Sequence, residues 1–260
     1  MALTDIKNKT VLVTGASSGI GQACADLFAS LGARLILLAR REERLLTLSH
    51  ALTAAYAVEC HTVTLDIQER DTVKHAIASL PSEWQDIDIL VNNAGLAAGL
   101  SGFADADIDD WEAMLDTNVK GLLYITRAIL PGMRERDAGH IINIGSIAGH
   151  EIYPNGNVYC GTKHAVRAIT RGIKMDMLDS RIRVTSVDPG MVDTEFSTVR
   201  FKGDTSRASS VYDGMTPLTA SDVADTVVYC ASRPPHVNIA EVLMLPTDQA
   251  SATCVKRRNS

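Results

Sequence analysis

Tyr159 and Lys163 stand four positions apart, and Ser146 precedes the tyrosine by thirteen residues. In a helix this spacing places the phenol and the ammonium on one face, where positive charge favours ionisation of the phenol. An unperturbed tyrosine, with a pKa of about 10, is a poor base at neutral pH, so proton transfer requires a cation beside it. The pair alone also occurs by chance on exposed helices. The elements around it decide whether it predicts a catalytic site.

A glycine-rich turn near the start of the chain predicts a dinucleotide site. Residues Thr10–Thr14 read as a buried strand, the turn Gly15–Gly21 (GASSGIG) follows at once, and an apolar-periodic stretch runs on to Leu31. Glycines in such a turn let the backbone approach a pyrophosphate, and the first N–H groups of the helix attract it. Strand, glycine turn and helix together indicate nucleotide binding rather than a merely flexible turn.

The end of the second strand, residues 34–38, predicts which dinucleotide binds. An acidic residue there would accept hydrogen bonds from a ribose 2′-hydroxyl, but Arg40 and Arg41 follow instead. A guanidinium pairs with a 2′-phosphate, so we predict NADP rather than NAD. The alternative is that both arginines only solvate a helix start beside the acidic residues 42–43.

Length and composition predict one globular domain. The chain has 260 residues, 46% hydrophobic and 22% charged, and a formal net charge of −6, which argues against a nucleic-acid surface. The N-terminal residues 1–7 lack the apolar core of a signal peptide, and no apolar run is long enough to cross a bilayer, so we expect a cytoplasmic protein. Five scattered cysteines are expected to be reduced: Cys24, Cys60, Cys160, Cys230 and Cys254.

Apolar strands alternate with about six helices along the chain. Five further strands are predicted at residues 61–65, 87–92, 140–145, 182–187 and 241–245. Their continuous apolar character suits a parallel sheet buried on both faces, so the predicted fold class is α/β, a doubly wound Rossmann-like parallel sheet of about seven strands. Polar residues at strand ends then gather in one crevice: Asp66, Asn92–Gly95, Ser146 and Pro189–Gly190.

In this order the motifs resemble those of the short-chain dehydrogenase/reductase family over nearly the whole chain, residues 1–260 as one domain. The motifs are Thr14-Gly15-x-x-x-Gly19-x-Gly21, Asp66, Asn92-Asn93-Ala94-Gly95, Asn118, Ser146, Tyr159-x-x-x-Lys163 and Pro189-Gly190. The resemblance implies that Ser146 orients the substrate oxygen, Tyr159 exchanges its proton, Lys163 lowers the phenol pKa and holds the nicotinamide ribose, and Asn118 positions a relay water. The implied NADP(H) site comprises Gly15, Ser17, Ser18, Gly19, Ile20, Gly21, Arg40, Arg41, Asp66, Ile67, Asn93, Ala94, Gly95, Tyr159, Lys163, Pro189, Gly190, Val192 and Thr194.

A narrower resemblance concerns the substrate. Residues 156–159, 194–204 and 235–239 resemble segments of NADP-dependent 3-hydroxy acid dehydrogenases, also described as serine or allo-threonine dehydrogenases. This implies hydride transfer at the 3-hydroxyl carbon of a short acid such as L-serine, allo-threonine or 3-hydroxypropionate. A carboxylate substrate requires a cation, and Arg200 or Lys202, in the expected substrate loop 191–220, is a candidate; the alternative is a mobile loop whose charges face water.

Two other functions remain open at this stage. A broad carbonyl reductase or a 3-oxoacyl thioester reductase would share the cofactor and the catalytic residues, whereas a noncatalytic NADP(H) sensor would share only the fold. No metal is expected, and His150, His164 and His236 are predicted to be surface or packing residues. Long amphipathic patterns at residues 111–133 and 158–178 are compatible with helices buried between subunits, and related enzymes are commonly tetramers, so we expect a homotetramer.

Overall fold

A seven-stranded sheet forms the centre of the computed structural model, which describes residues 5–258. All neighbouring strands pair in parallel, in the order β3-β2-β1-β4-β5-β6-β9. The strands are β1 (Thr10–Thr14), β2 (Arg34–Ala39), β3 (Cys60–Thr64), β4 (Ile89–Asn92), β5 (Gly139–Ile144), β6 (Ile182–Pro189) and β9 (Glu241–Met244). The prediction of about seven parallel strands is confirmed. Residues 1–4, used above to argue against a signal peptide, lie outside the described residues.

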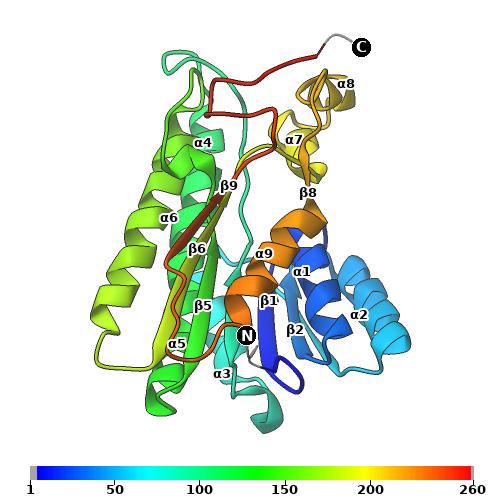
Figure 1. Cartoon of the computed structure of the whole chain (residues 1–260), viewed down its shortest axis with the longest axis vertical. Helices are drawn as coiled ribbons and strands as arrows, with labels where there is room; N and C mark the ends of the chain where they lie inside the picture. The colour runs from blue at the N-terminus through cyan, green and yellow to red at the C-terminus, as the bar shows by residue number, and fades with distance from the viewer. Residues whose placement is uncertain (1–4, 259–260) are drawn as a thin grey trace.

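Helices cover both faces of this sheet (Figure 1). Phe28, Leu45 and Val223 pack against one face and belong to α1, α2 and α9, while Val73 and Ile129 of α3 and α5 pack against the other. Strands buried on both sides need continuous apolar sequence, as in β1, where all five residues are buried. The helices of the described part are α1 (Gly19–Ser30), α2 (Glu42–Tyr56), α3 (Arg70–Ala78), α4 (Ile108–Leu115), α5 (Leu122–Glu135), α6 (Asn157–Asp176), α7 (Glu195–Arg200), α8 (Thr205–Ser210) and α9 (Ala220–Ala231).

Two features depart from the sequence prediction. The amphipathic stretch 111–133 contains a π-helical turn at Asp116–Gly121, through which the helical backbone continues from α4 to α5. A second, two-stranded sheet also forms from β7 (Val192–Asp193) and β8 (Leu218–Thr219), and it brackets α7 and α8. These short elements lie within the segment 191–220 and lack the long periodic pattern by which helices and strands are recognised.

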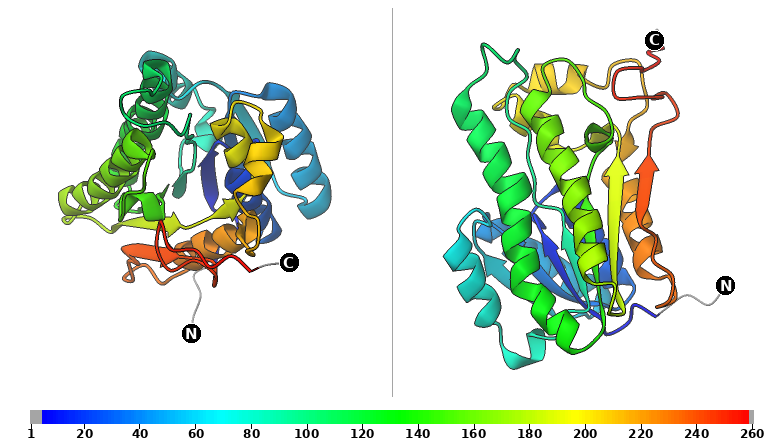
Figure 2. Two further views of the ribbon diagram at one scale, coloured as in Figure 1. Left: turned by 90° about the horizontal axis from the view of Figure 1, so that it is seen from above. Right: turned by 90° about the vertical axis from the view of Figure 1, so that its left-hand side faces the viewer.

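The strand order reverses between β1 and β4, and this places the site. Successive strands β1, β2 and β3 extend the sheet in one direction, whereas β4, β5 and β6 extend it in the other. A crevice therefore opens at the carboxyl ends of β1 and β4. The arrowheads in Figure 2 point toward this end of the molecule, where α7 and α8 lie. No helix within residues 5–258 is both long enough and apolar enough to span a bilayer.

Candidate active site

The glycine turn after β1 forms one wall of a cavity of about 330 Å³. Gly15 and Gly19 have φ values of 65° and 53°, which only glycine adopts without strain. A Cβ atom on Gly15 would lie 2.9 Å from Asn93 Nδ2, and one on Gly21 would overlap the carbonyl oxygen of Gly15. Glycine is thus required both for the bend and for the close approach of the two turns.

The turn after β4 is fastened to the glycine turn by Thr14. The Thr14 hydroxyl accepts hydrogen bonds from the backbone N–H groups of Asn93 (3.0 Å) and Ala94 (2.9 Å). The Asn93 amide in turn donates to the carbonyl oxygen of Thr14 at 3.0 Å. These hydrogen bonds hold the turn after β4 against the glycine turn, at the point where the strand order reverses.

Arg41 lies at the mouth of the crevice with two hydroxyls and a carboxylate around it. Its guanidinium donates to Ser17 Oγ (3.0 Å) and Ser18 Oγ (2.7 Å), and forms an ion pair with Glu195 at 3.1 Å. Glu195 also pairs with Arg44 at 2.9 Å. A cation held beside serine hydroxyls and next to a glycine turn fits the 2′-phosphate of NADP(H). The acidic residue that would select a free 2′-hydroxyl does not follow β2.

Arg40 has a different environment from Arg41. Its side chain is 65% exposed, and its guanidinium lies 3.4 Å from Asp66 Oδ2. Asp66 also accepts a hydrogen bond from the backbone N–H of Gln68 at 3.0 Å. Both Arg40 and Asp66 line the cavity, so the structure brings them to the site, with Arg41 the more enclosed of the two arginines.

Ser146, Tyr159 and Lys163 meet at the inner end of the cavity. Ser146 follows β5 and begins a short 3₁₀ turn, its Oγ accepting a bond from the N–H of Ala148 at 3.1 Å. Tyr159 and Lys163 lie on the same face of α6 and are both buried, and Lys163 Nζ donates to the carbonyl oxygen of Ile144 at 2.9 Å. These three side chains come from a strand end and one helix, which hold them rigidly.

The pKa of Tyr159 departs from the sequence expectation. Burial raises this pKa well above its ordinary value, and repulsion from Tyr153 adds to the rise; the charge of Arg200 and a hydrogen bond with Ser146 lower it. Lys163 Nζ lies 6.0 Å from the centre of the phenol ring. Arg200, rather than Lys163, is therefore the cation that lowers the pKa of Tyr159 in this arrangement. Because Arg200 lies 41 residues after Tyr159 in the sequence, the helical spacing contained no sign of it.

Asn118 lies in the π-helical turn, is 2% exposed and is bonded to Thr162 of α6. Its amide nitrogen donates to the carbonyl oxygen of Leu96 (2.8 Å) and to Thr162 Oγ1 (3.1 Å), and its oxygen accepts from the N–H of Leu96 at 2.8 Å. The side chain thus joins three elements of the crevice. Both amide hydrogens are occupied, and the implied role in holding a relay water stays a prediction.

Arg200, at the end of α7, lies over the inner end of the site. Its guanidinium carbon is 5.0 Å from the centre of the Tyr159 ring and 5.4 Å from that of Phe196, and its Nη2 donates to the hydroxyl of Tyr153 at 2.7 Å. The Nε–H is buried and has no hydrogen-bond partner among the described residues. Lys202, the other candidate cation, is 61% exposed and pairs with Asp110 at 2.9 Å. The structure therefore favours Arg200.

The cavity gathers nearly every residue predicted to hold the cofactor. Gly21 is the exception, since it is buried beneath the turn and acts through close packing. The sequence interpretation missed several lining residues that belong to no quoted motif: Leu65, Gln68, Leu96 and Thr117. Glu195, Phe196 and Val199 also line the cavity and lie in the segment 194–204 of the narrower resemblance. Gln68 and Leu96 directly follow recognised strand-end residues, which is the signal that would have found them. His150, predicted to be a surface or packing residue, is partly buried and forms a hydrogen bond with Asp188 at 2.8 Å.

Comparisons of sequence and of structure both find dehydrogenases among the known proteins. The chain matches the short chain dehydrogenase family over residues 9–204. It is 48% identical to NADP-dependent 3-hydroxy acid dehydrogenase YdfG of Salmonella typhi over 93% of this chain and 96% of that protein. It is 42% identical to NADP-dependent 3-hydroxy acid dehydrogenase of Schizosaccharomyces pombe, over 99% and 100%. Among solved structures, the closed form of serine dehydrogenase complexed with NADP⁺ superimposes with a TM-score of 0.89 at 45% identity, covering 96% of this chain and 100% of that one.

Proposed function

The chain belongs to the short-chain dehydrogenase/reductase family, and we propose that it is an NADP-dependent oxidoreductase acting on the 3-hydroxyl group of a short 3-hydroxy acid. Substrates of the L-serine, allo-threonine and 3-hydroxypropionate type have a carboxylate one carbon removed from the carbinol. The observation that carries this choice is the buried, unpartnered Nε–H of Arg200 above Tyr159. A guanidinium so placed binds a carboxylate with charge-assisted hydrogen bonds while the hydroxyl faces the phenol.

The chemistry assigned to each side chain follows from its position. NADP(H), when bound, supplies the hydride acceptor or donor. In oxidation, Tyr159 takes the hydroxyl proton as the carbinol C–H is lost as hydride, and a carbonyl forms; in reduction, Tyr159 returns that proton. Ser146 donates a hydrogen bond to the reacting oxygen and stabilises its developing charge. The positive charge of Arg200 and the hydrogen bond with Ser146 favour the ionised phenol against the effect of burial.

The cofactor preference rests on Arg41. Its guanidinium is held by Ser17 and Ser18 at the end of the crevice opposite Tyr159, where the 2′-phosphate of NADP(H) would lie. The residues 191–220 cover the crevice between these two ends and supply Thr194, Phe196 and Arg200. We propose this segment as the substrate loop.

Spectrophotometric reduction of NADP⁺ tests the proposal. The panel comprises L-serine, L-allo-threonine, D-threonine, 3-hydroxypropionate and 3-hydroxyisobutyrate, with uncharged secondary alcohols as matched controls. Turnover confined to the acids supports the proposed substrate class. Turnover only with uncharged alcohols, or only as ketone or thioester reduction by NADPH, moves the substrate to the reductase alternative. Tight NADPH binding with no turnover in any assay would point to a sensor.

We also propose that the chain forms a cytoplasmic homotetramer. Apolar side chains exposed on neighbouring helices support an interface between subunits: Ile108 and Leu115 on α4, Leu123 on α5 and Met175 on α6. Burying such side chains between copies is a common route to symmetric oligomers. Light scattering should give four times the chain mass of 28.0 kDa, and a monomer mass would overturn this proposal.

A further inference from the structure

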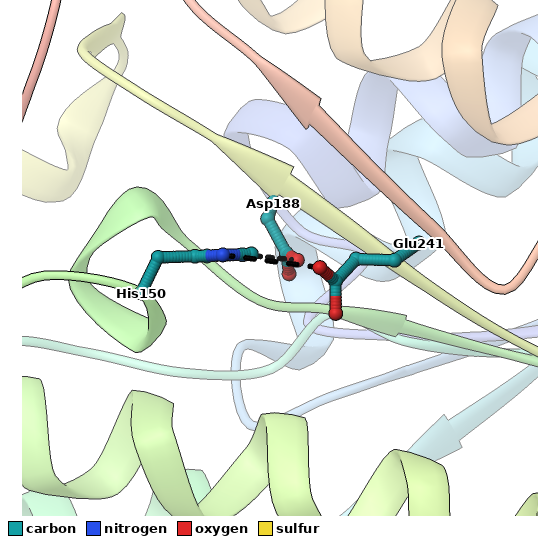
Figure 3. A group of neighbouring side chains, drawn as sticks. All are labelled: His150, Asp188 and Glu241. Carbon is teal, nitrogen blue, oxygen red and sulfur yellow. Dashed lines mark hydrogen bonds and ion pairs between the residues drawn. The ribbon is translucent and has the colours of Figure 1, made fainter.

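Three ionisable side chains, His150, Asp188 and Glu241, meet close to one another (Figure 3). His150 ends the 3₁₀ turn that begins at Ser146, Asp188 lies near the end of β6, and Glu241 begins β9. His150 Nε2 lies 2.8 Å from Asp188 Oδ2, and its Nδ1 lies 3.8 Å from Glu241 Oε1. Because a carboxylate only accepts, Nε2 is the donor in the shorter contact.

The contacts of Glu241 argue that this cluster is a charge network rather than a metal site. Arg167 donates to both carboxylate oxygens of Glu241 at 2.9 Å, and Arg171 pairs with the same carboxylate at 3.2 Å. A cation would have to displace both arginines, and the lone pairs that remain on Asp188 face His150 and Ser186. The two arginines instead occupy both carboxylate oxygens of Glu241.

Asp188 is the buried centre of the network, with 1% of its side chain exposed. Ser186 Oγ donates to its Oδ1 at 2.5 Å, and its Oδ2 accepts from His150. A Cβ atom on Gly145 would overlap Asp188 Oδ1, so the residue before Ser146 is glycine where this carboxylate passes beneath the strand end. The turn that presents Ser146 is therefore built around Asp188.

Asp188 also acts on Lys163. Burial of Lys163 lowers the pKa of its ammonium to about 8, and the negative charge of Asp188 is the opposing influence that raises it. The only hydrogen-bond acceptor found for Lys163 Nζ within the described residues is the neutral carbonyl of Ile144. The residue after Ile144 is Gly145, where a Cβ atom would overlap Asp188 Oδ1, so the buried carboxylate lies beside the strand end to which Lys163 is bonded.

We propose that Asp188, oriented by His150, is a positioning residue that supplies the counter-charge for the ammonium of Lys163 and ties the Ser146 turn to β6. The pair acts through Ser146 and Lys163 and does not touch the reacting atoms. Loss of the carboxylate removes the counter-charge outright, whereas loss of the imidazole leaves a buried carboxylate short of one donor. This inference rests on the proposed function only in giving Lys163 a part in turnover.

The charged and titratable groups facing this pair come from every element packed around it. They are Tyr159 and Lys163 on the inner side of α6, Arg167 and Arg171 further along α6, and Glu241 on β9. Arg167 and Arg171 are both paired with Glu241, and the charge of Asp188 also acts on Arg167. The titration of Lys163 is accordingly the direct readout of the carboxylate.

The experiment is an NMR titration of the protein labelled at lysine ¹³Cε, with NADP⁺ bound and without it. Lys163→Arg identifies the Lys163 signal by its loss. In Asp188→Asn the pKa of Lys163 should fall by about one unit, the shift typical of losing a nearby opposite charge. His150→Leu keeps the carboxylate, so it should shift the pKa of Lys163 less than Asp188→Asn does. An unchanged Lys163 titration in Asp188→Asn would overturn the inference.

Turnover provides the second readout and separates this inference from the proposed function. Asp188→Asn should lower kcat for the 3-hydroxy acid about tenfold, and it should move the alkaline limb of the pH profile to lower pH, because Lys163 then loses its proton sooner. A lower kcat with an unmoved limb would leave only a structural role and defeat the proposal. Asp137→Asn, at an exposed ion pair with Arg181, is the matched control and should change neither value. A wild-type protein without turnover refutes the function, while the NMR titration still decides the inference.

Discussion

The floor of the crevice, formed by Ser146, Tyr159 and Lys163, and the segment 191–220 above it are built in opposite ways. Ser146, Tyr159 and Lys163 are each less than 10% exposed, they come from a strand end and one long helix, and their polar atoms bond largely to the main chain. The segment above is made of two short helices and a two-residue strand pair, and exposed ion pairs at Glu195 and Lys202 connect it to the rest. Buried, backbone-fixed groups suit the reaction step, and exposed pairs that exchange readily suit substrate entry.

Arg200 belongs to both regions. It is carried by α7 of the upper segment, yet its guanidinium lies against the ring of Tyr159 and lowers the pKa of that phenol. Arrival of a carboxylate at Arg200 would change the charge beside the catalytic base at the same time as it positions the hydroxyl. The comparison thus suggests that the floor determines which reaction occurs and that the upper segment determines which molecule undergoes it.

The largest effect is expected on the floor, from Tyr159→Phe. This change removes the proton acceptor and leaves the ring in place, so kcat should fall about 10³-fold while NADPH affinity stays the same. Stopped-flow or steady-state kinetics together with a fluorescence titration of NADPH would measure both. Tyr56→Phe, at an exposed tyrosine paired with Asp26, is the control. Retained turnover in Tyr159→Phe would place the proton acceptor elsewhere.

The next effect is expected in the upper segment, from Arg200→Ala. Losing a charge-assisted contact should raise KM for a 3-hydroxy acid about 10- to 100-fold, beyond the smaller loss that uncharged alcohols share through the raised pKa of Tyr159. Lys202→Ala, two residues away in the same segment, removes a cation already paired with Asp110 and should leave KM unchanged. Equal losses for charged and uncharged substrates would show that Arg200 acts only through Tyr159, and the division between the two regions would fail there.

A third effect concerns the outer end of the crevice, where the regions meet at Arg41. Arg41→Ala should weaken NADPH binding about tenfold or more and leave NADH binding nearly unchanged, because only NADPH presents a 2′-phosphate. Arg40→Ala, at the more exposed arginine, should have a smaller effect. Isothermal titration would measure the affinities of the wild type and of each variant for NADPH and for NADH. An equal loss of affinity for NADPH and NADH would show that Arg41 acts by holding the glycine turn in shape and not by binding the 2′-phosphate.

The difference between the regions also explains what the sequence could predict. The strands, the turn Gly15–Gly21 and the pair Tyr159 and Lys163 are local patterns, since apolar runs, φ-positive glycines and helical spacing each operate over a few residues. The seven predicted strands begin and end within two residues of the observed strands. The doubly wound sheet then follows from alternation and from the handedness of crossovers.

The missed features all depend on contacts between distant parts of the chain. Glu195 pairs with Arg41 across 154 positions, and Asp188 pairs with His150 across 38. The π-helical turn between α4 and α5 likewise depends on distant contacts, because Asn118 in this turn bonds to Leu96 and to α6. Residue types alone predicted no partner for either acid. Only the fold assigns each one a partner.

The smallest expected effect tests the link between the upper segment and the cofactor end. Glu195 pairs with both Arg41 and Arg44, so its carboxylate occupies cations that a 2′-phosphate would use, and the two anions would repel each other. Since the pairs are about half exposed, Glu195→Gln should tighten NADPH binding only about threefold, and the gain should shrink at high salt. NADH affinity serves as the internal control. Weaker NADPH binding in Glu195→Gln would mean instead that the carboxylate arranges the arginines for the phosphate, so that closure of the segment and cofactor binding reinforce each other.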